Sequence, residues 1–503
     1  MSKRQFGLIY ISSYQARLFI VDLKKLAIIE QLSSAQFVQG GKKFEVYENE
    51  LPRLTDALIG FKRKIAEYGI DNYKVYGNRQ LLDKISARYL ADQIKVRTGL
   101  KIEWLNGAQI AYYKIIAGMA LPQFSELADD EFTYLLSMGS AMLNLTLFKG
   151  QHYLSTWNFA LGPEEIEEMA AMTRDTPSDP IDIIGDYISR KLVSFKTIEK
   201  PTGKARIIIQ HVSGRGEQSL RPQEKARVID LKQFAGVYED FREAPDQYLM
   251  EKYELDTDSL ARMKPTIVLI NQLVKIIKPH MMTLTQSSAI TGLMIQEAAR
   301  LKYRPDEYST IVLTATKNIA RRYESGGKHS NLSNKFALHI FDRLAHAGMV
   351  DRRDRQLLEI AARLHDIGNF VNFHNHYEHA AYIVGANQII GLSDRENEML
   401  LSILKHQDIT NLNADEREYR HLDPALQVRV AKLAAILRLA NSLDASRKQK
   451  ISKIVVSIKD EQMLITVTSK RDLTLERWVF EKNVNLAEAV FGMKIAIKQK
   501  RGK

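Results

Sequence analysis

The sequence predicts two α/β units in tandem, followed by an all-helical region and a small α+β domain. At 503 residues the chain is too long for a single hydrophobic core. Three strand patterns followed by alternating helix and strand occur twice in its first part. Apolar residues then recur at helical spacing from about 265 to 445, and strand patterns return after 450.

Three short strand patterns open the first unit, within residues 5–33, where apolar and β-branched residues are enriched. Helical patterns over 50–68 and 80–97 then alternate with two further strands. Another helix pattern begins at residue 107. The first unit therefore consists of three strands and then alternating helix and strand.

The same order restarts near residue 131. EFTYLLSM, MLNLTLFKG and QHYLSTWNFA, within 131–160, are again three strands, and Gly162-Pro163-Glu164-Glu165 signals the start of a helix. A unit repeated every ~130 residues indicates an internal duplication. Two such units facing each other form an actin-like (ribonuclease H-like) architecture, whose cleft binds phosphate groups. Two unrelated α/β domains are the alternative.

The region after residue 300 is predicted to be helical and then to return to strands. Six segments place apolar residues at helical spacing: 304–323, 330–347, 351–367, 376–390, 394–406 and 425–441. After them we predict strands at KIVVSI (453–458), MLITVT (463–468) and LERWVF (475–480), with a short helix near 485–491. The expected domains are actin-like subdomains at 1–125 and 126–300, a helical domain at 301–448 and an α+β domain at 449–503.

Composition excludes several classes of protein. Lys and Arg outnumber Asp and Glu by 72 to 60, so the net charge is +12, and a basic surface attracts nucleic acid, nucleotides and polyphosphate alike. No apolar stretch approaches the length of a membrane span, and no signal-peptide cleavage site follows the first strand. The absence of cysteine excludes disulfides and thiolate metal sites. We expect a cytoplasmic protein with no membrane association, and nothing indicates a nucleic-acid ligand.

Histidines are concentrated in the helical region, where nine of the twelve lie between 329 and 421. His365 and Asp366 are adjacent at the end of a predicted helix. One imidazole nitrogen and one carboxylate suit a divalent cation such as Mg²⁺ or Mn²⁺. His329 begins an earlier helix, and Asn441 or Asp444 lies near the end of a later one, so these residues could complete the site.

Three further histidines, His376, His379 and His406, are candidates for a second metal or for binding phosphate. Asn441 is a poorer ligand than an aspartate because its amide is neutral. The alternative is that the His-Asp pair arose by chance and that the histidines are ordinary surface residues. The helical context and the number of histidines favour a metal or phosphate site.

A family resemblance becomes specific at these residues. His329 and Asp342 are followed by LLEIAARLHDIGNFV (357–371), HYEHAAYIV (376–384), LSILKHQ (401–407) and KLAAILRLANSLDAS (432–446). In order and spacing these segments resemble the HD domain of Gram-positive-type members of the exopolyphosphatase and guanosine pentaphosphate phosphohydrolase (Ppx/GppA) family. The resemblance implies metal ligands at His329, His365 and Asp366, with Asn441 where the family has an aspartate. It continues through 450–503.

The first phosphate loop of this family, Asp-x-Gly-Ser-Asn-Ser-x-Arg-Leu, resembles residues 10–18. Ser13 and Arg17 are kept for phosphate binding, but Tyr10 replaces the aspartate on the metal side. The second loop, Asp-x-Gly-Gly-Gly-Ser-Thr-Glu, resembles residues 137–144 and keeps only Gly139. Adjacent glycines let backbone N–H groups approach phosphate, and the side chains here obstruct that approach.

The catalytic segment of the family, Ser-Gly-x-Glu-Glu-Ala, resembles residues 106–111 and has lost both glutamates. Gln109 stands at the position of the first. A neutral amide cannot accept a proton from an attacking water, although Gln109 could still orient one.

The sequence therefore predicts an exopolyphosphatase-like protein that binds inorganic polyphosphate or (p)ppGpp, with phosphohydrolase activity at the actin-like cleft weak or lost. The resemblance also implies a homodimer. One alternative is an active exopolyphosphatase that releases terminal phosphate. The other is a metal-dependent HD-domain nucleotide phosphohydrolase, in which a metal-bound water attacks phosphate.

Overall fold

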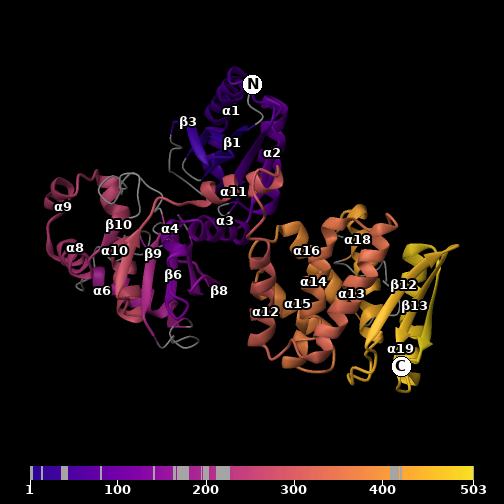
Figure 1. The fold of residues 1–503 in the computed structure, drawn as a ribbon. Coiled ribbons are helices and arrows are strands. Elements are labelled where there is room, and N and C mark those ends of the chain that lie inside the picture. The colour runs from indigo at the N-terminus through magenta and orange to yellow at the C-terminus, as the bar shows by residue number, and fades with distance from the viewer. Residues whose placement is uncertain are drawn as a thin grey trace. The chain divides into compact units, whose positions relative to one another are not determined.

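The computed structural model divides the chain into two compact units, Met1–Tyr308 and Ser309–Lys503 (Figure 1). The described residues are 4–12, 15–35, 43–79, 82–139, 142–162, 166, 180–193, 195, 203–210, 227–407, 419 and 422–501. Among them, no helix combines the length and the hydropathy that crossing a membrane would require. The predicted domain boundaries within each unit remain predictions.

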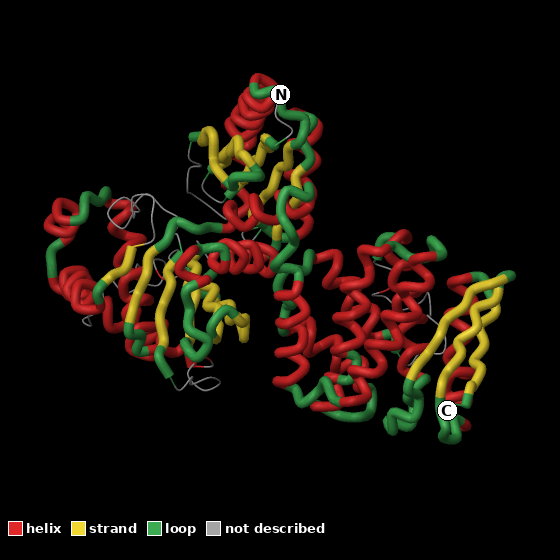
Figure 2. Tube along the Cα trace, in the orientation of Figure 1, coloured by secondary structure: helices red, strands yellow, loops and turns green. Residues whose placement is uncertain are grey.

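A five-stranded sheet of order β3-β2-β1-β4-β5 begins the first unit (Figure 2). Its strands are β1 (Gln5–Ile11), β2 (Ala16–Asp22), β3 (Ala27–Ser33), β4 (Tyr73–Asn78) and β5 (Ile102–Leu105). β1, β2 and β3 are antiparallel to one another, whereas β4 and β5 run parallel to β1. Alternate residues of β1 point to opposite faces, so Ile9 joins one core and Leu8 another.

Helices cover both faces of this sheet. α1 (Lys43–Glu67) and α2 (Lys84–Thr98) pack on the face of Ile9. α3 (Gly107–Met119) and α11 (Ala289–Arg300) pack on the face of Leu8. Because α11 follows the second sheet in the chain, the core of the first sheet is completed by a helix from much later in the sequence.

The second sheet has the order β8-β7-β6-β9-β11-β10. Its strands are β6 (Phe132–Met138), β7 (Leu143–Lys149), β8 (His152–Phe159), β9 (Ala205–Ile209), β10 (Arg227–Ile229) and β11 (Met281–Leu284). The described helices around it are α4 (Pro122–Ser125), α6 (Pro180–Lys191), α8 (Leu231–Glu243), α9 (Asp246–Lys252) and α10 (Thr257–Ile277). Residues from the sheet, α6, α8, α9 and α10 form one apolar core.

The two sheets share one topology, and this supports the predicted duplication. In each, three antiparallel strands stand beside two strands that run parallel to the first, as β6, β9 and β11 repeat β1, β4 and β5. β10 is an addition at the edge of the second sheet. This order supports the predicted actin-like architecture of the N-terminal part. The predicted helix start at Gly162 falls largely on 163–165, outside the described residues.

The second unit is helical up to residue 442 and then forms a small sheet. Its described helices are α12 (Thr310–Arg322), α13 (Lys328–His346), η2 (Arg352–Asp354), α14 (Arg355–Leu364), η3 (Ile367–Phe370), α15 (His376–Ala386), α16 (Asp394–Lys405) and α18 (Pro424–Ser442). The closing elements are β12 (Lys453–Lys459), β13 (Gln462–Thr468), α19 (Thr474–Phe491) and β14 (Lys494–Lys500). α18 packs against both α13 and α19 (Figure 1).

Two of the predicted elements are wrong. LERWVF (475–480) lies in α19 and not in a strand, and the short helix predicted near 485–491 is the end of that same helix. Glu476, Phe480 and Ala487 are buried, at spacings of four and seven that place them on one face of a helix. The local preference of bulky residues for strands is therefore overridden by tertiary packing. β11 also interrupts the region predicted to be helical from 265.

Gly292 sets how closely α11 approaches α3. A Cβ atom added there would lie 1.9 Å from the carbonyl oxygen of Tyr113. We expect Gly292→Ala to destabilise the first unit by about 1–3 kcal/mol, because backbone atoms would have to move. Gly236, within α8, has open space at the same position, so Gly236→Ala should stabilise by about 0.5–1 kcal/mol. Thermal unfolding of both variants measures the difference, and equal midpoints would contradict this account of the helix contact.

Candidate functional site

The first candidate site lies at the carboxyl ends of the strands of both sheets, where ligands bind in open α/β sheets. A backbone hydrogen bond closes the β1–β2 connection, from Ser12 N–H to the Gln15 carbonyl at 3.0 Å. The β6–β7 connection is closed in the same way, from Gly139 to Met142 at 2.8 Å. The two units thus share an equivalent backbone hydrogen bond where the resemblance places phosphate loops. Ser13 lies outside the described residues.

Tyr10 and Arg17 are directly opposite each other on β1 and β2. Tyr10 is 7% exposed. Burial raises the pKa of its phenol to about 12, so the side chain is neutral near pH 7. The guanidinium of Arg17 is half-buried and lies 5.9 Å from the centre of the Phe19 ring. This end of the first sheet therefore keeps a cation but has no carboxylate at position 10.

Gln109 caps α3. Its side-chain oxygen accepts a hydrogen bond from the backbone N–H of Asn106 at 3.2 Å, and its own backbone N–H donates to the Asn106 side chain at 2.9 Å. This reciprocal pair is a capping box, which satisfies helix N–H groups that have no partner within the helix. The acceptor oxygen of Gln109 is thus engaged in holding the helix start.

A neutral network closes the equivalent end of the second sheet. Ser137, where the resemblance places an aspartate, is buried and donates a hydrogen bond to the side-chain oxygen of Gln210. The Gln210 amide donates to Ser287 at 2.9 Å and to the carbonyl oxygen of Lys114 at 2.8 Å. Residues from β6, from α3 and from the ends of β9 and β11 are thereby joined without any charged group.

Lys114 was missed by the sequence reasoning. It is the single charged residue of α3, and its ammonium lies 3.4 Å from the side-chain oxygen of Asn144. The side-chain nitrogen of Asn144 donates to the side-chain oxygen of Asn158 at 2.6 Å. Burial lowers the pKa of Lys114 to about 8. One cation in an otherwise uncharged helix was the signal that could have identified it.

The second candidate site is a cluster of His329, His365 and Asp366, whose ligand atoms all lie within 4.8 Å of one another. His329 lies in the first turn of α13, and His365 and Asp366 connect α14 to η3. Gly368 is required beside them, because a Cβ atom there would lie 1.7 Å from the His376 carbonyl oxygen. The structure thus brings together three of the four predicted metal ligands.

Asn441, the fourth predicted ligand, contacts the cluster through His329. The Nε2 atom of His329 lies 2.7 Å from the Asn441 side-chain oxygen, and its Nδ1 atom lies 2.8 Å from Asp444. His365 donates from Nδ1 to the carbonyl oxygen of Ala362 at 2.8 Å, while its buried Nε2 atom makes no hydrogen bond and lies 3.7 Å from Oδ1 of Asp366. Asn441 and Asp444 therefore hold His329, and an open nitrogen remains on His365.

Arg447, also missed by the sequence reasoning, pairs with Asp366 through two hydrogen bonds of 2.8 and 2.9 Å. Burial alone would raise the pKa of the Asp366 carboxyl, but His365 and Arg447 outweigh burial and lower that pKa to about 2. Burial lowers the pKa of His365. Asp366 is thus a buried carboxylate that already has a cation.

The three ligand atoms are close enough together to bind one divalent metal ion. Their existing hydrogen bonds, however, occupy the positions that a metal would need. Both oxygens of Asp366 are used by Arg447, and Nε2 of His329, the nitrogen left by its contact with Asp444, lies against the Asn441 side-chain oxygen. A metal also requires its ligands deprotonated and free of competing partners. The donor set as arranged here does not fit a metal ion.

The other predicted site histidines are His376, His379 and His406. Among the described residues, none of them belongs to this cluster. His406 is buried at the end of α16, and its Nδ1 atom lies 2.6 Å from the Ser402 carbonyl oxygen. His376 and His379 are half-buried on α15, with His376 stacked on Phe373 at 5.7 Å between ring centres. Their predicted phosphate contacts stay predictions.

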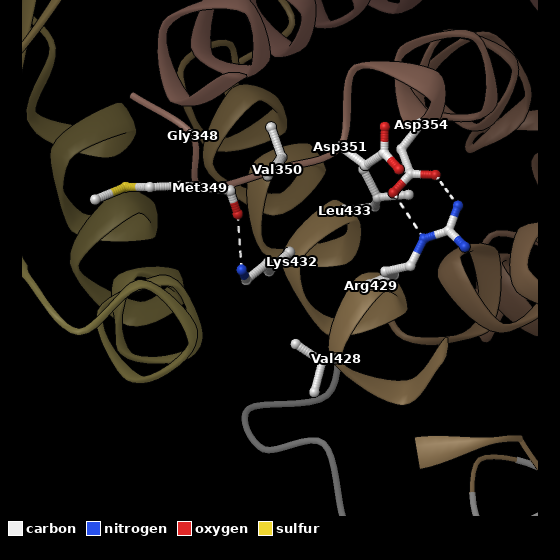
Figure 3. Close-up of a pocket in the computed structure, with 9 residues that line it drawn as sticks. All are labelled: Gly348, Met349, Val350, Asp351, Asp354, Val428, Arg429, Lys432 and Leu433. Atoms are coloured by element: carbon white, nitrogen blue, oxygen red, sulfur yellow. Dashed lines mark hydrogen bonds and ion pairs between the residues drawn. The ribbon is translucent and has the colours of Figure 1, made fainter. Parts of the chain in front are cut away.

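A pocket of about 310 Å³ lies on another part of the second unit (Figure 3). It is lined by Gly348, Met349, Val350, Asp351, Asp354, Val428, Arg429, Lys432 and Leu433. Arg429 is paired with Asp354, and the Lys432 ammonium donates to the Met349 carbonyl oxygen at 2.7 Å. Both cations of the pocket are engaged by its own wall, and it contains none of the predicted site residues.

The lowered pKa of Lys114 has a measurable consequence for stability. Its folded pKa of about 8 lies below the ordinary value of 10.5, so the unfolded chain binds more protons between these values. Stability from this residue therefore rises with pH across that window. We expect the melting temperature of the native chain to rise relative to Lys114→Met as pH increases from 8 towards 10.5. A difference that stays constant with pH would contradict a buried ammonium.

Comparison with known proteins gives one match to a family model. Residues 311–488 match the model described as Ppx/GppA phosphatase, domain III. An Aquifex aeolicus Ppx/GppA family member shares 17% identity, and the match covers 59% of this chain and 98% of that one, with a TM-score of 0.49.

An exopolyphosphatase from Cytophaga hutchinsonii shares 16% identity, with coverage of 59% and 99% and a TM-score of 0.46. A Bacteroides thetaiotaomicron protein with an actin-like ATPase fold shares 9%, with coverage of 58% and 96% and a TM-score of 0.30. The strand order of the two sheets, and not these neighbours, supports the actin-like architecture. Similarity to the Ppx/GppA phosphatases is shown over residues 311–488, where the model of their third domain matches this chain.

Proposed function

We propose that this chain is an exopolyphosphatase-like relative of the Ppx/GppA phosphatases that binds inorganic polyphosphate or (p)ppGpp, with weak or lost hydrolytic activity. The match of residues 311–488 to domain III supports the relationship, and so does the duplicated strand order of the first unit. A homodimer in the cytoplasm is part of the same proposal. The homodimer is what the family resemblance implies.

The observation that carries the proposal is the position of Gln109. A hydrolase needs a group that accepts a proton from the attacking water, and such a base typically contributes about 10²–10⁴ in rate. Here the amide at that position is neutral, buried, and engaged in the capping box with Asn106. A side chain that holds the helix start is poorly suited to activating a water.

Two further positions support weak catalysis for the same reason. Mg²⁺ and Mn²⁺ prefer carboxylate oxygens. Tyr10 presents a buried neutral phenol, and the Ser137 hydroxyl is already bonded to Gln210. Neither supplies the negative charge that a metal bridging to phosphate requires. At positions 10, 109 and 137, this part of the fold therefore has neutral side chains where the resemblance places acidic ones.

Binding of a polyanion is supported by the cations that remain. Arg17 stands at the end of the first sheet, and Lys114 stands on α3 beside the second. The Lys114 ammonium contacts the neutral side-chain oxygen of Asn144 at 3.4 Å, and burial lowers its pKa to about 8. The net charge of +12 would raise the local concentration of polyphosphate around the molecule.

The metal-dependent HD-domain alternative is disfavoured by one specific observation. A metal that activates water needs an open coordination site and free ligands. Arg447 covers both oxygens of Asp366. The active-exopolyphosphatase alternative is disfavoured by Gln109, Tyr10 and Ser137, and the assay below separates the three possibilities.

The test is phosphate release from long-chain polyphosphate with Mg²⁺ or Mn²⁺, measured for the native chain, Gln109→Glu and His365→Ala, together with binding of the same polymer. We expect salt-sensitive binding and release at the background rate in the native chain. Robust release that His365→Ala leaves intact would contradict the proposal. Phosphate release by the native chain that is lost only in His365→Ala would show that hydrolysis takes place at the histidine–aspartate cluster.

Binding should depend on Lys114. We expect Lys114→Met to weaken polyphosphate binding about tenfold, because a charge-assisted hydrogen bond contributes roughly 1.5–3 kcal/mol. Lys232→Met, which removes an exposed lysine of α8, is the matched control and should change affinity little. Equal losses in both variants would show that only the overall charge matters and not the cleft.

A further inference from the structure

The loop between α18 and β12 reaches back over the histidine–aspartate cluster. From it the Arg447 guanidinium makes a two-pronged contact with Asp366, at 2.8 Å from Nη2 to Oδ1 and 2.9 Å from Nη1 to Oδ2. This is the paired geometry in which arginine and carboxylate fit best. The Asp366 side chain is 7% exposed and that of Arg447 is 45% exposed, so the carboxylate is buried and the cation caps it from the solvent side.

The backbone of this loop adopts a conformation that L residues avoid. Arg447 has φ of 54° and Gln449 has φ of 47°, both in the left-handed region. Residues with a Cβ atom occupy that region at a cost in free energy and stay there only when the surroundings impose it. Neither residue is a glycine, so something nearby must hold the loop in this shape.

Two buried carboxylates hold it. Asp444, fully buried, accepts hydrogen bonds from the backbone N–H of Gln449 at 2.7 Å and from its side chain at 3.2 Å, in addition to its contact with His329. Glu476 on α19, also fully buried, accepts from Lys450 at 3.1 Å and from the backbone N–H of Ser446 at 3.4 Å. The loop that carries Arg447 is thus fixed from both ends.

These contacts leave little for a metal to bind. Coordination by Asp366 would require Arg447 to move away or a divalent cation to lie beside a guanidinium in a buried setting, where like charges repel strongly. The two nitrogens of His329 already face Asp444 and Asn441. The open Nε2 atom of His365 is a single ligand and cannot hold a metal alone.

We infer that Arg447 is the resident cation of the histidine–aspartate cluster, in the place where a divalent metal would bind. The cluster then joins the helical part of the second unit to its small sheet, since it draws residues from α13, the α14–η3 connection, α18 and the loop before β12 into one network. The inference concerns the second unit alone and is independent of polyanion binding by the first.

The first experiment titrates the full native chain and Asp366→Asn with Mn²⁺ alone, by calorimetry. We expect the two titrations to be indistinguishable, with no stoichiometric binding that depends on Asp366, and we expect EDTA to leave the melting temperature of the native chain unchanged. One equivalent of Mn²⁺ bound by the native chain and lost in Asp366→Asn would overturn the inference.

The second experiment measures coupling between Arg447 and Asp366 by thermal unfolding. Arg447→Ala leaves a buried carboxylate without its cation, so we expect a melting temperature lower by roughly 3 °C or more. Asp366→Asn in that background should recover part of the loss. The matched control is Arg353→Ala, which removes an exposed arginine of η2 and should change little.

Additive effects of the two substitutions, or a loss no larger than in Arg353→Ala, would also overturn the inference. Arg447→Lys keeps the charge but cannot bridge both oxygens, and we expect it to lie between the native chain and Arg447→Ala. If Arg447→Ala fails to fold, Arg447→Lys and the Mn²⁺ titration of the native chain still decide the outcome.

Discussion

Both candidate sites are shaped by the free-energy cost of burying a polar or charged group without a partner. At the ends of the second sheet, Ser137 and Gln210 satisfy each other and leave no charge to compensate. In the second unit, Asp366 and Asp444 remain ionised, and each has a partner that fixes its direction. The site in the first unit thus has neutral side chains at Ser137 and Gln210, whereas the site in the second unit keeps its carboxylates and pairs Asp366 with Arg447.

Much of the fold could be predicted because its signals are local or periodic. The strand pattern that begins near residue 5 and restarts near 131 corresponds to two sheets of the same topology. The strand predicted at LERWVF (475–480) was wrong because its β-prone residues lie on a helix, and distant contacts decide which face of that helix is buried. No local sequence pattern could predict the role of Arg447, because its partner Asp366 lies 81 positions away in the sequence. Gln210, 73 positions from Ser137, escaped for the same reason. The contact with Asp366 also depends on a left-handed backbone conformation at Arg447.

The site residues differ in what sequence could say about them. His329, His365 and Asp366 come together as expected, since each lies at a helix terminus and the helices pack side by side. The sequence could not show that their hydrogen bonds are already taken. Gln109 illustrates the same limit, because its identity suggested a lost base, but only its geometry assigns the amide oxygen to the helix cap.

The contact of α11 with the first sheet has a consequence for biosynthesis. One face of that sheet, including Phe6, Leu8 and Tyr10, is covered by α3 together with α11, which begins only at Ala289. At a translation rate of about 5–20 residues per second, that helix emerges on the order of ten seconds or more after the sheet is complete. During this interval the part of the face that α11 covers stays exposed on the nascent chain, so the core of the first sheet is completed only after the second sheet has been synthesised.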